Sequence, residues 1–176
     1  MGVKGINSER TGLGSVFCFP HPVNEYAART VAGLTFGLAV AIIVTDARWL
    51  IWVLAYEFLA RVFTGPTLSL TGAFATRVIV PKLIKRNNPV AGPPKQFAQA
   101  VGLSFAATAL MLTYGFGLTG AAYALLGVLA AFAALEAFVG FCAGCFVFGI
   151  LIRVGVIPEE TCVRCADLAF PKRDNL

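Results

Sequence analysis

The sequence predicts an all-α integral membrane protein with four transmembrane helices, arranged as two hairpins that are each followed by a short helix. Three observations support this fold class: the composition, four long apolar stretches, and the distribution of basic residues. The chain of 176 residues is 58% hydrophobic and only 13% charged, whereas soluble domains are roughly half apolar and about a quarter charged. A soluble protein of this size cannot bury so much apolar surface, so the composition excludes a soluble globular enzyme.

Four apolar stretches are candidates for helices that cross the bilayer. They cover residues 28–45, 49–63, 97–114 and 121–141, and about 20 helical residues are needed to span the hydrocarbon core. The second stretch is shorter than this length, so we expect it to tilt or to extend into its flanks. Helices are expected because a backbone in lipid must satisfy its own polar groups.

The basic residues predict the orientation of these helices. Arg48 is the one basic residue in the turn between the first two stretches, and the turn between the last two contains none. The other 13 of the 14 Lys and Arg residues lie toward the opposite ends of the helices. Basic residues concentrate on the cytoplasmic side, so both termini and the middle loop are predicted to be cytoplasmic. Anionic lipid then accounts for the net charge of +5, and no nucleic-acid partner is expected.

The two halves of the chain resemble each other, which indicates parallel repeats. GLTF at residues 33–36 matches GLSF at 102–105, and VLA occurs at both 53–55 and 128–130. Each repeat would be a hairpin followed by a short cytoplasmic interfacial helix, with the repeat axis along the membrane normal. The predicted parts of the chain are a cytoplasmic N-terminal segment (1–27), a transmembrane domain (28–157) with a basic interfacial segment (70–95), and a cytoplasmic tail that contains cysteines (158–176).

Four charged residues are expected inside or at the edge of the bilayer: Arg29, Glu57, Arg61 and Glu136. Arg61 can pair with Glu57 one turn earlier on its own helix, or with Glu136, which the repeat alignment places opposite it. Charges in lipid are costly and usually pair inside the bundle, so the prediction is a polar clamp that holds the helices together. A proton or ion relay is the functional alternative, and a small-solute transporter would have to use the same residues.

Four of the five cysteines form two C-x-x-C pairs, Cys142 with Cys145 and Cys162 with Cys165. The full spacing, C-x2-C-x16-C-x2-C, fits a zinc site with four thiolate ligands. The remaining cysteine, Cys18, is interpreted as a packing residue. Small packing residues remain an alternative for the first pair too, because cysteine is common in buried positions.

The same spacing also fits a pair that cycles between dithiol and disulfide. An attacking thiolate is stabilised at a helix N-terminus, and a helix from Cys145 to Arg153 is expected after Gly140 and Gly144 interrupt the fourth stretch. Arg153 and Arg164 are the candidate residues that stabilise the thiolates. Zinc is the one cofactor that the cysteines suggest, and the redox interpretation needs none.

Four segments of the chain also resemble a known family. They are FPHPVNEYAARTVAG at Phe19–Gly33, FLARVFTGPTLS at Phe58–Ser69, GPPKQFAQAVG at Gly92–Gly102, and LEAFVGFCAGC followed by GVIPEETCVRC within Leu135–Cys165. On these motifs the chain is identified as a member of the bacterial integral membrane proteins of the "domain of unknown function" family 4395. It departs from them at His21, where Asn is expected. The resemblance implies a small multi-span protein of the bacterial cytoplasmic membrane with paired cysteines in its last third.

A more distant similarity to membrane hairpins attached to rhodanese domains points to thioredoxin- or rhodanese-like partners. The leading hypothesis is therefore a membrane thiol protein that exchanges electrons or sulfane sulfur with such a soluble partner. The alternative is an accessory or scaffold subunit of a larger membrane complex or homo-oligomer, with the four cysteines binding structural zinc. A small-solute transporter is the third hypothesis, and whether the protein is an enzyme stays open.

Overall fold

The computed structural model describes residues 23–84, 89–90 and 92–155 of the chain, and these are helical apart from turns and one pair of very short strands. In chain order the elements are β1 (Val23–Asn24), α2 (Glu25–Thr45), α3 (Leu50–Thr64), α4 (Leu70–Phe74), η1 (Ala75–Ile84), β2 (Pro89–Val90), α5 (Gly92–Leu110), η2 (Met111–Gly115), α6 (Thr119–Ala134), η3 (Leu135–Val139) and α7 (Ala143–Arg153). Each η element is a π-helical continuation of the α-helix before it. The predicted all-α fold class is confirmed.

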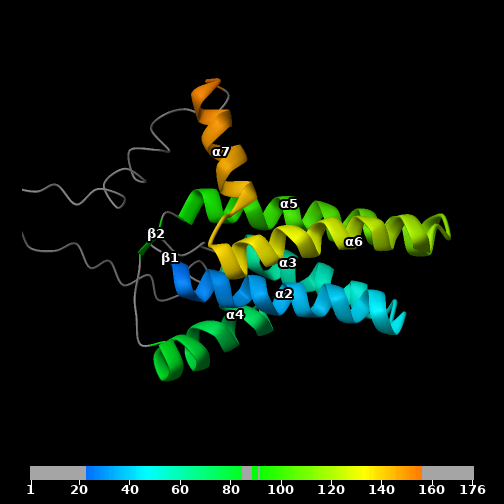
Figure 1. Cartoon of the computed structure of the whole chain (residues 1–176), viewed down its shortest axis with the longest axis horizontal. Coiled ribbons are helices and arrows are strands. Elements are labelled where there is room, and N and C mark those ends of the chain that lie inside the picture. The colour runs from blue at the N-terminus through cyan, green and yellow to red at the C-terminus, as the bar shows by residue number, and fades with distance from the viewer. Residues whose placement is uncertain (1–22, 85–88, 91, 156–176) are drawn as a thin grey trace, which may run out of the picture.

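The four longest helices lie together in one bundle (Figure 1). α2 and α3 form one hairpin, α5 and α6 form the other, and both hairpins begin at the same end of the bundle. The most extensive contacts join α3 with α5 and α2 with α6, so the bundle is held together mainly by contacts between the hairpins. At the end where α2 and α5 begin, α7 stands away from the bundle and packs on α5, while α4 and η1 pack on α2.

Local signals fix where the helices start. Val23 pairs with Val90 in an antiparallel bridge that brings the beginnings of α2 and α5 together. The Asn24 side chain caps α2 by accepting the Tyr26 N–H at 3.0 Å, which satisfies a donor that the first turn leaves unpaired. Glu25 in the first turn complements the positive end of the helix dipole.

Residues with positive φ mark where three of the helices end. Gly65 (φ 60°) ends α3 and Gly140 (φ 81°) ends η3, which is the conformation that glycine adopts without a steric cost. Asp46 (φ 51°) ends α2 without being glycine. Its carboxylate accepts hydrogen bonds from Arg48 and from the Tyr123 hydroxyl of α6, and the bond from Arg48 is the main reason that the pKa of Asp46 is lowered.

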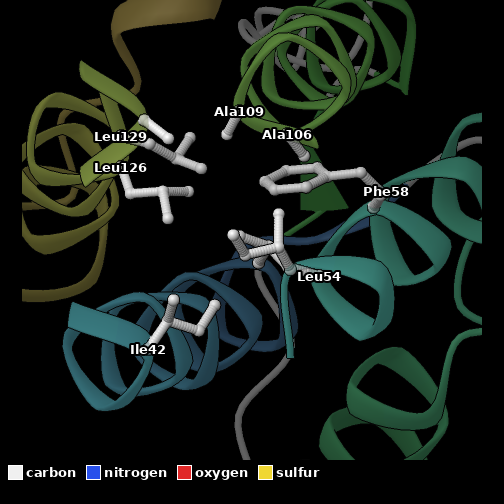
Figure 2. Close-up of a cluster of buried hydrophobic side chains, with 10 residues drawn as sticks. Ile42, Leu54, Phe58, Ala106, Ala109, Leu126 and Leu129 are labelled. Carbon is white, nitrogen blue, oxygen red and sulfur yellow. The ribbon is translucent and has the colours of Figure 1, made fainter. Parts of the chain in front are cut away.

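The core lies between the two hairpins and is built from apolar residues of all four long helices. Figure 2 shows Phe58 of α3 beneath Ala106 of α5, with Leu126 of α6 and Ile42 of α2 turned toward the same centre. Ile42, Ala106 and Leu126 have no exposed surface, and Phe58 is 5% exposed. The alanines leave room for the ring, and a Cβ at Gly102 would lie 2.1 Å from it. Small residues on α5 therefore allow close contact between helices, as in membrane bundles.

Three helices are long and apolar enough to cross a membrane: Glu25–Thr45, Gly92–Gly115 and Thr119–Val139. α3, with 15 residues, is shorter than these. Large apolar side chains also cover the outside of the molecule, including Val44 at 77%, Phe138 at 72% and Trp52 at 59% exposure. Soluble monomers avoid such extended apolar surface, so the helices and the surface together indicate a membrane protein with helices that contact lipid.

Candidate functional site

The Cys142–Cys145 pair lies at the point where the chain leaves the bundle to form α7. Gly140 turns the chain with a left-handed conformation, and Cys142 follows in an extended conformation as the N-cap of α7. The Cys142 sulfur accepts a hydrogen bond from the backbone N–H of Cys145 at 3.4 Å. The first C-x-x-C pair thus spans the first turn of a helix, where the helix dipole and unpaired N–H groups favour a thiolate.

The two sulfur atoms of this pair are 2.8 Å apart, and the Cys145 thiol donates to the Cys142 sulfur. Both side chains are half-buried and both thiols are free. A disulfide brings two sulfurs to about 2.05 Å, so bond formation needs only a short movement. The pair is already arranged as an attacking thiol and a resolving thiol.

A buried ion pair lies beside the cysteines. Lys95 Nζ, in the first turn of α5, is 2.5 Å from the Glu136 carboxylate of η3, and their side chains are 11% and 15% exposed. The Cys145 hydrogen bond is the main cause of the lowered pKa of Cys142, and the positive charge of Lys95 lowers it further. The pKa of Cys145 is raised, because its proton is held in the bond to Cys142 and burial disfavours its charge. Cys142 is therefore the thiol that ionises first.

Close packing fixes the position of this helix start. Gly144, between the two cysteines, lies against Ala98 of α5, and a Cβ on Gly144 would be 2.5 Å from the Ala98 Cβ and 2.6 Å from its Cα. One turn further, the rings of Phe148 and Phe97 lie with centroids 5.6 Å apart. The start of α7 is therefore held against the same helix turns that carry Lys95.

A cavity of about 210 Å³ opens between the helices next to Cys142. Its walls are mostly apolar, and they include the rings of Phe58, Phe105 and Phe132. The polar side chains in its wall include Glu136 and Gln99, in addition to the Cys142 thiol. This arrangement is typical of sites for small organic ligands, which combine an apolar enclosure with a few polar groups.

The charged residues expected inside the bilayer fall into connected clusters. Of the two partners considered for Arg61, the structure has Glu57, at 3.6 Å on the same helix. The Glu57 carboxylate also accepts hydrogen bonds from Ser69 Oγ at 2.6 Å, from Leu70 N–H at 2.9 Å, and from the backbone and hydroxyl of Thr71. Glu57 therefore ties the start of α4 to the middle of α3.

Arg61 and Arg29 bind other parts of the bundle. Arg61 donates to Gln99 Oε1 of α5 and to Thr71 Oγ1, both at 2.8 Å, and its guanidinium lies 4.5 Å from the centre of the Phe58 ring, a favourable cation–π position. Arg29 of α2 donates to the backbone carbonyls of Ala137 and Phe138 at the end of η3. These contacts link α2, α3, α5 and η3 at the end of the bundle that carries the cysteines.

The sequence reasoning missed the residues that complete these clusters. Lys95 is the close partner of Glu136, and Gln99 is a partner of Arg61. Lys95 is the last residue of the predicted basic segment (70–95), and it stands directly before an apolar stretch of helix length. A basic residue at that position of a span is the signal that could have suggested an intramembrane partner.

One predicted thiolate-stabilising residue, Arg153, lies away from the first cysteine pair, and other residues considered from the sequence lie outside the described part of the chain. Arg153 is the last residue of α7, so about 16 Å of helix separates it from Cys142 at 1.5 Å per residue. It does not neighbour the first pair, and the nearby cation is Lys95 instead. The candidates Cys162, Arg164 and Cys165 lie outside the described residues, as do the packing residue Cys18 and His21. Within the described ranges, no three metal-ligating side chains come together as a metal site.

Comparison with known proteins identifies the family of this chain. Neither the curated proteins nor the solved structures gave a match. The pattern of one protein family, described as "Domain of unknown function (DUF4395)", matches residues 23–153. This range includes all the long helices, the ion pair and the first cysteine pair. The predicted resemblance is thereby confirmed, and the chain belongs to the DUF4395 family.

Proposed function

We propose that the protein is a membrane thiol protein in which Cys142 and Cys145 exchange electrons or sulfane sulfur with a soluble thioredoxin- or rhodanese-like partner. The observation that carries this proposal is the 2.8 Å separation of the two sulfurs at the start of α7. Lys95 and the helix N-terminus both favour the Cys142 thiolate. Because thiol exchange depends on a thiolate, the arrangement supports Cys142 as the attacking group and Cys145 as the resolving group.

Atoms and electrons balance in this exchange with either a disulfide or a persulfide partner. With a disulfide partner, Cys142 attacks one partner sulfur, and Cys145 then attacks Cys142, so that one disulfide is reduced and one is formed. With a persulfide partner, the outer sulfur passes to Cys142, and attack by Cys145 releases it as hydrogen sulfide while forming the same disulfide. Cys162 and Cys165 would form the second thiol pair of the relay.

The test uses the purified full chain in mild detergent, with oxidised thioredoxin or a persulfide-loaded rhodanese as the partner. Thiols are counted by the mass added by a maleimide, and sulfide release distinguishes the two chemistries. We expect Cys142→Ser to abolish exchange and Cys145→Ser to trap a mixed disulfide, while the matched control Cys18→Ser exchanges normally. An unreactive Cys142 in the otherwise intact protein would overturn the proposal.

The alternative is a scaffold subunit of a larger membrane complex, with Cys142, Cys145, Cys162 and Cys165 binding structural zinc. The closeness of the first two thiols suits two ligands of one metal as well as it suits a disulfide. Elemental analysis of reduced protein separates the two. About one zinc per chain, absent from Cys162→Ser, would support the scaffold, whereas metal-free protein whose thiols oxidise in pairs supports the relay.

We also infer that α3 crosses the membrane, which gives four spans with both termini on the cytoplasmic side. In support, α3 runs back along the bundle beside α2 (Figure 1). The exposed side chains of Trp52 and Leu59 make its outer face apolar. In a variant without native cysteines, an impermeant maleimide applied outside cells should label Arg48→Cys and Gly117→Cys. It should not label Arg77→Cys, and the opposite pattern would reverse the orientation.

The packing supports the inference of two parallel repeats. If α2, α3 and η1 of the first unit correspond to α5, α6 and α7 of the second, the contact of α3 with α5 corresponds to that of α6 with α2. The packing of η1 on α2 then corresponds to that of α7 on α5. Gly65 and Gly140 end the second helix of each unit with positive φ. Ser69 and Cys142 then cap the short helices through the same contact, to the N–H three residues ahead. We infer that the intramembrane charged residues hold the two repeats together.

A further inference from the structure

We propose that the cavity beside Cys142 binds the ring of a membrane quinone, which accepts two electrons from the Cys142–Cys145 dithiol. This inference rests on the proposed function and deepens it, because it names the second redox partner. A thiol relay fed by a soluble dithiol needs an acceptor for the electrons that it collects. The Cys142 thiol lines the cavity next to α7, which is formed together with α2, α3, α5 and the end of α6.

The size and shape of the cavity suit a single substituted ring. Its volume of about 210 Å³ exceeds the roughly 150 Å³ of an apolar protein cavity that holds benzene. Phe105 and Phe132 meet edge to face in its wall, with centroids 6.5 Å apart, and Phe58 adds a third ring. Flat aromatic walls favour a flat, unsaturated occupant through ring–ring contacts.

The polar groups in the wall distinguish a neutral quinone from an anionic ligand. Among the described residues that line this cavity, Glu136 is charged and there is no Lys or Arg to bind an anion, whereas Lys95 and Arg61 line a second cavity of about 200 Å³. Gln99 Oε1 already accepts from Arg61, so the amide N–H groups of Gln99 are the donors for a quinone carbonyl. Glu136 is placed to accept a hydroxyl of the quinol that forms.

The reaction balances without a further reagent. The two S–H bonds of Cys142 and Cys145 break, one S–S bond forms, and the quinone takes up two electrons and two protons to become the quinol. The acceptor is the quinone and the donor is the dithiol. A soluble dithiol then reduces the disulfide again by exchange, so electrons pass from the soluble partner to the membrane pool.

The experiment uses the reduced full-length protein in detergent, freed of reductant, with decylubiquinone as the probe. Quinol formation is followed by absorbance, and remaining thiols are counted by maleimide mass. We expect one quinol for each disulfide formed. In Ala133→Phe, a ring fills the cavity, because Ala133 is 8% exposed and lines it. Quinone reduction should slow by on the order of tenfold, equivalent to about 1.4 kcal/mol, while exchange with thioredoxin persists.

The matched control is Ala131→Phe, which puts the same ring on the exposed side of α6 and should leave both reactions unchanged. Phe132→Leu adds no volume and should also slow quinone reduction, which keeps the test valid if Ala133→Phe fails to fold. An azido-quinone should crosslink within α5 and α6 of the Cys142→Ser/Cys145→Ser variant. Wild type that exchanges with thioredoxin but leaves decylubiquinone oxidised overturns this inference and leaves the proposed function standing. Failure with both partners overturns the proposed function.

Discussion

Lys95 Nζ lies 2.5 Å from Glu136 Oε1, in an ion pair that joins the first turn of α5 to η3. The two residues are 41 positions apart in the chain, and both face the start of α7. Their opposite charges act on Cys142 in opposite directions: Lys95 lowers the pKa of the thiol and Glu136 raises it. The ion pair therefore links α5 to η3 and also influences the pKa of Cys142.

The first prediction concerns how pH controls the reactivity of Cys142. Lys95→Met removes the stabilising cation and should raise the pKa of Cys142, whereas Glu136→Gln removes the repelling anion and should lower it. Because only the thiolate reacts, the alkylation rate rises as the pH passes through this pKa. The midpoint should therefore move to higher pH in Lys95→Met and to lower pH in Glu136→Gln. The measurement is the rate at which iodoacetamide alkylates Cys142 as a function of pH, in variants that also carry Cys145→Ser. Midpoints that move in the same direction in both variants would contradict this prediction.

The second prediction concerns Glu57, which is 1% exposed and accepts four hydrogen bonds in addition to its ion pair. Glu57→Gln keeps the shape but leaves Arg61 without a buried counter-charge, so we expect a loss of about 3 kcal/mol in the free energy of unfolding. Ser69→Ala removes the cap of α4 and should cost about 1 kcal/mol. Thermal unfolding in detergent measures both changes.

The exposed Arg48–Asp46 pair supplies the control for this prediction. Arg48→Gln breaks an ion pair at the other end of the bundle and should change stability by no more than about 0.5 kcal/mol. Equal losses in Glu57→Gln and Arg48→Gln would contradict a special role for the buried cluster.

The third prediction uses two glycines of the same helix. Gly144→Ala places a Cβ against the Ala98 backbone at 2.6 Å, whereas Gly149 has no atom within 4 Å of the added Cβ. We expect Gly144→Ala to cost about 2 kcal/mol and to speed alkylation of Cys142, because α7 must move away from α5. Gly149→Ala should be neutral or stabilising by up to about 1 kcal/mol, since alanine favours helix. Similar alkylation rates in both variants would rule out this packing.

The fourth prediction concerns Arg29, whose planar guanidinium donates to the carbonyls of both Ala137 and Phe138. Lysine keeps the charge but cannot form this fork, so Arg29→Lys should loosen η3 and the turn at Gly140. We expect faster hydrogen exchange at residues 136–141, measured by mass spectrometry, with unchanged exchange in α3. A uniform increase along the whole chain would instead indicate global destabilisation.

The extent of the helices could be predicted from the sequence because hydropathy reports it directly. The apolar stretches at 28–45 and 49–63 correspond to α2 (Glu25–Thr45) and α3 (Leu50–Thr64), with boundaries moved by no more than three residues. Polar caps account for the difference at the start of α2: Asn24 and Glu25 begin the helix before its apolar part. The helix Cys145–Arg153, predicted from the glycines that interrupt the apolar run, corresponds to α7 (Ala143–Arg153), which begins between the two cysteines.

The partners of the charged side chains could not be predicted in the same way. The pairing of Lys95 with Glu136 depends on how α5 approaches the end of α6, and hydropathy contains no information on that contact. The spacing of four residues made Glu57 one of the two predicted partners of Arg61, since residues four apart share a helix face. The cavity beside Cys142 was also beyond prediction, because it arises where side chains from several helices fail to meet.

The π-helical turn at Leu135–Val139 makes the number of residues between α6 and α7 as important as their identity. Each residue of an α-helix turns the chain by about 100° and advances it by about 1.5 Å, and a π-helical turn holds one residue more between its hydrogen-bonded groups. Deletion of a single residue there would rotate Gly140 and everything after it away from Ala98, Lys95 and Arg29, even if every side chain were kept. Loop insertions at Phe116–Leu118, at the opposite end of the bundle, would leave that geometry untouched. The length of the chain is therefore constrained between α6 and α7 but free to vary in the turn at residues 116–118.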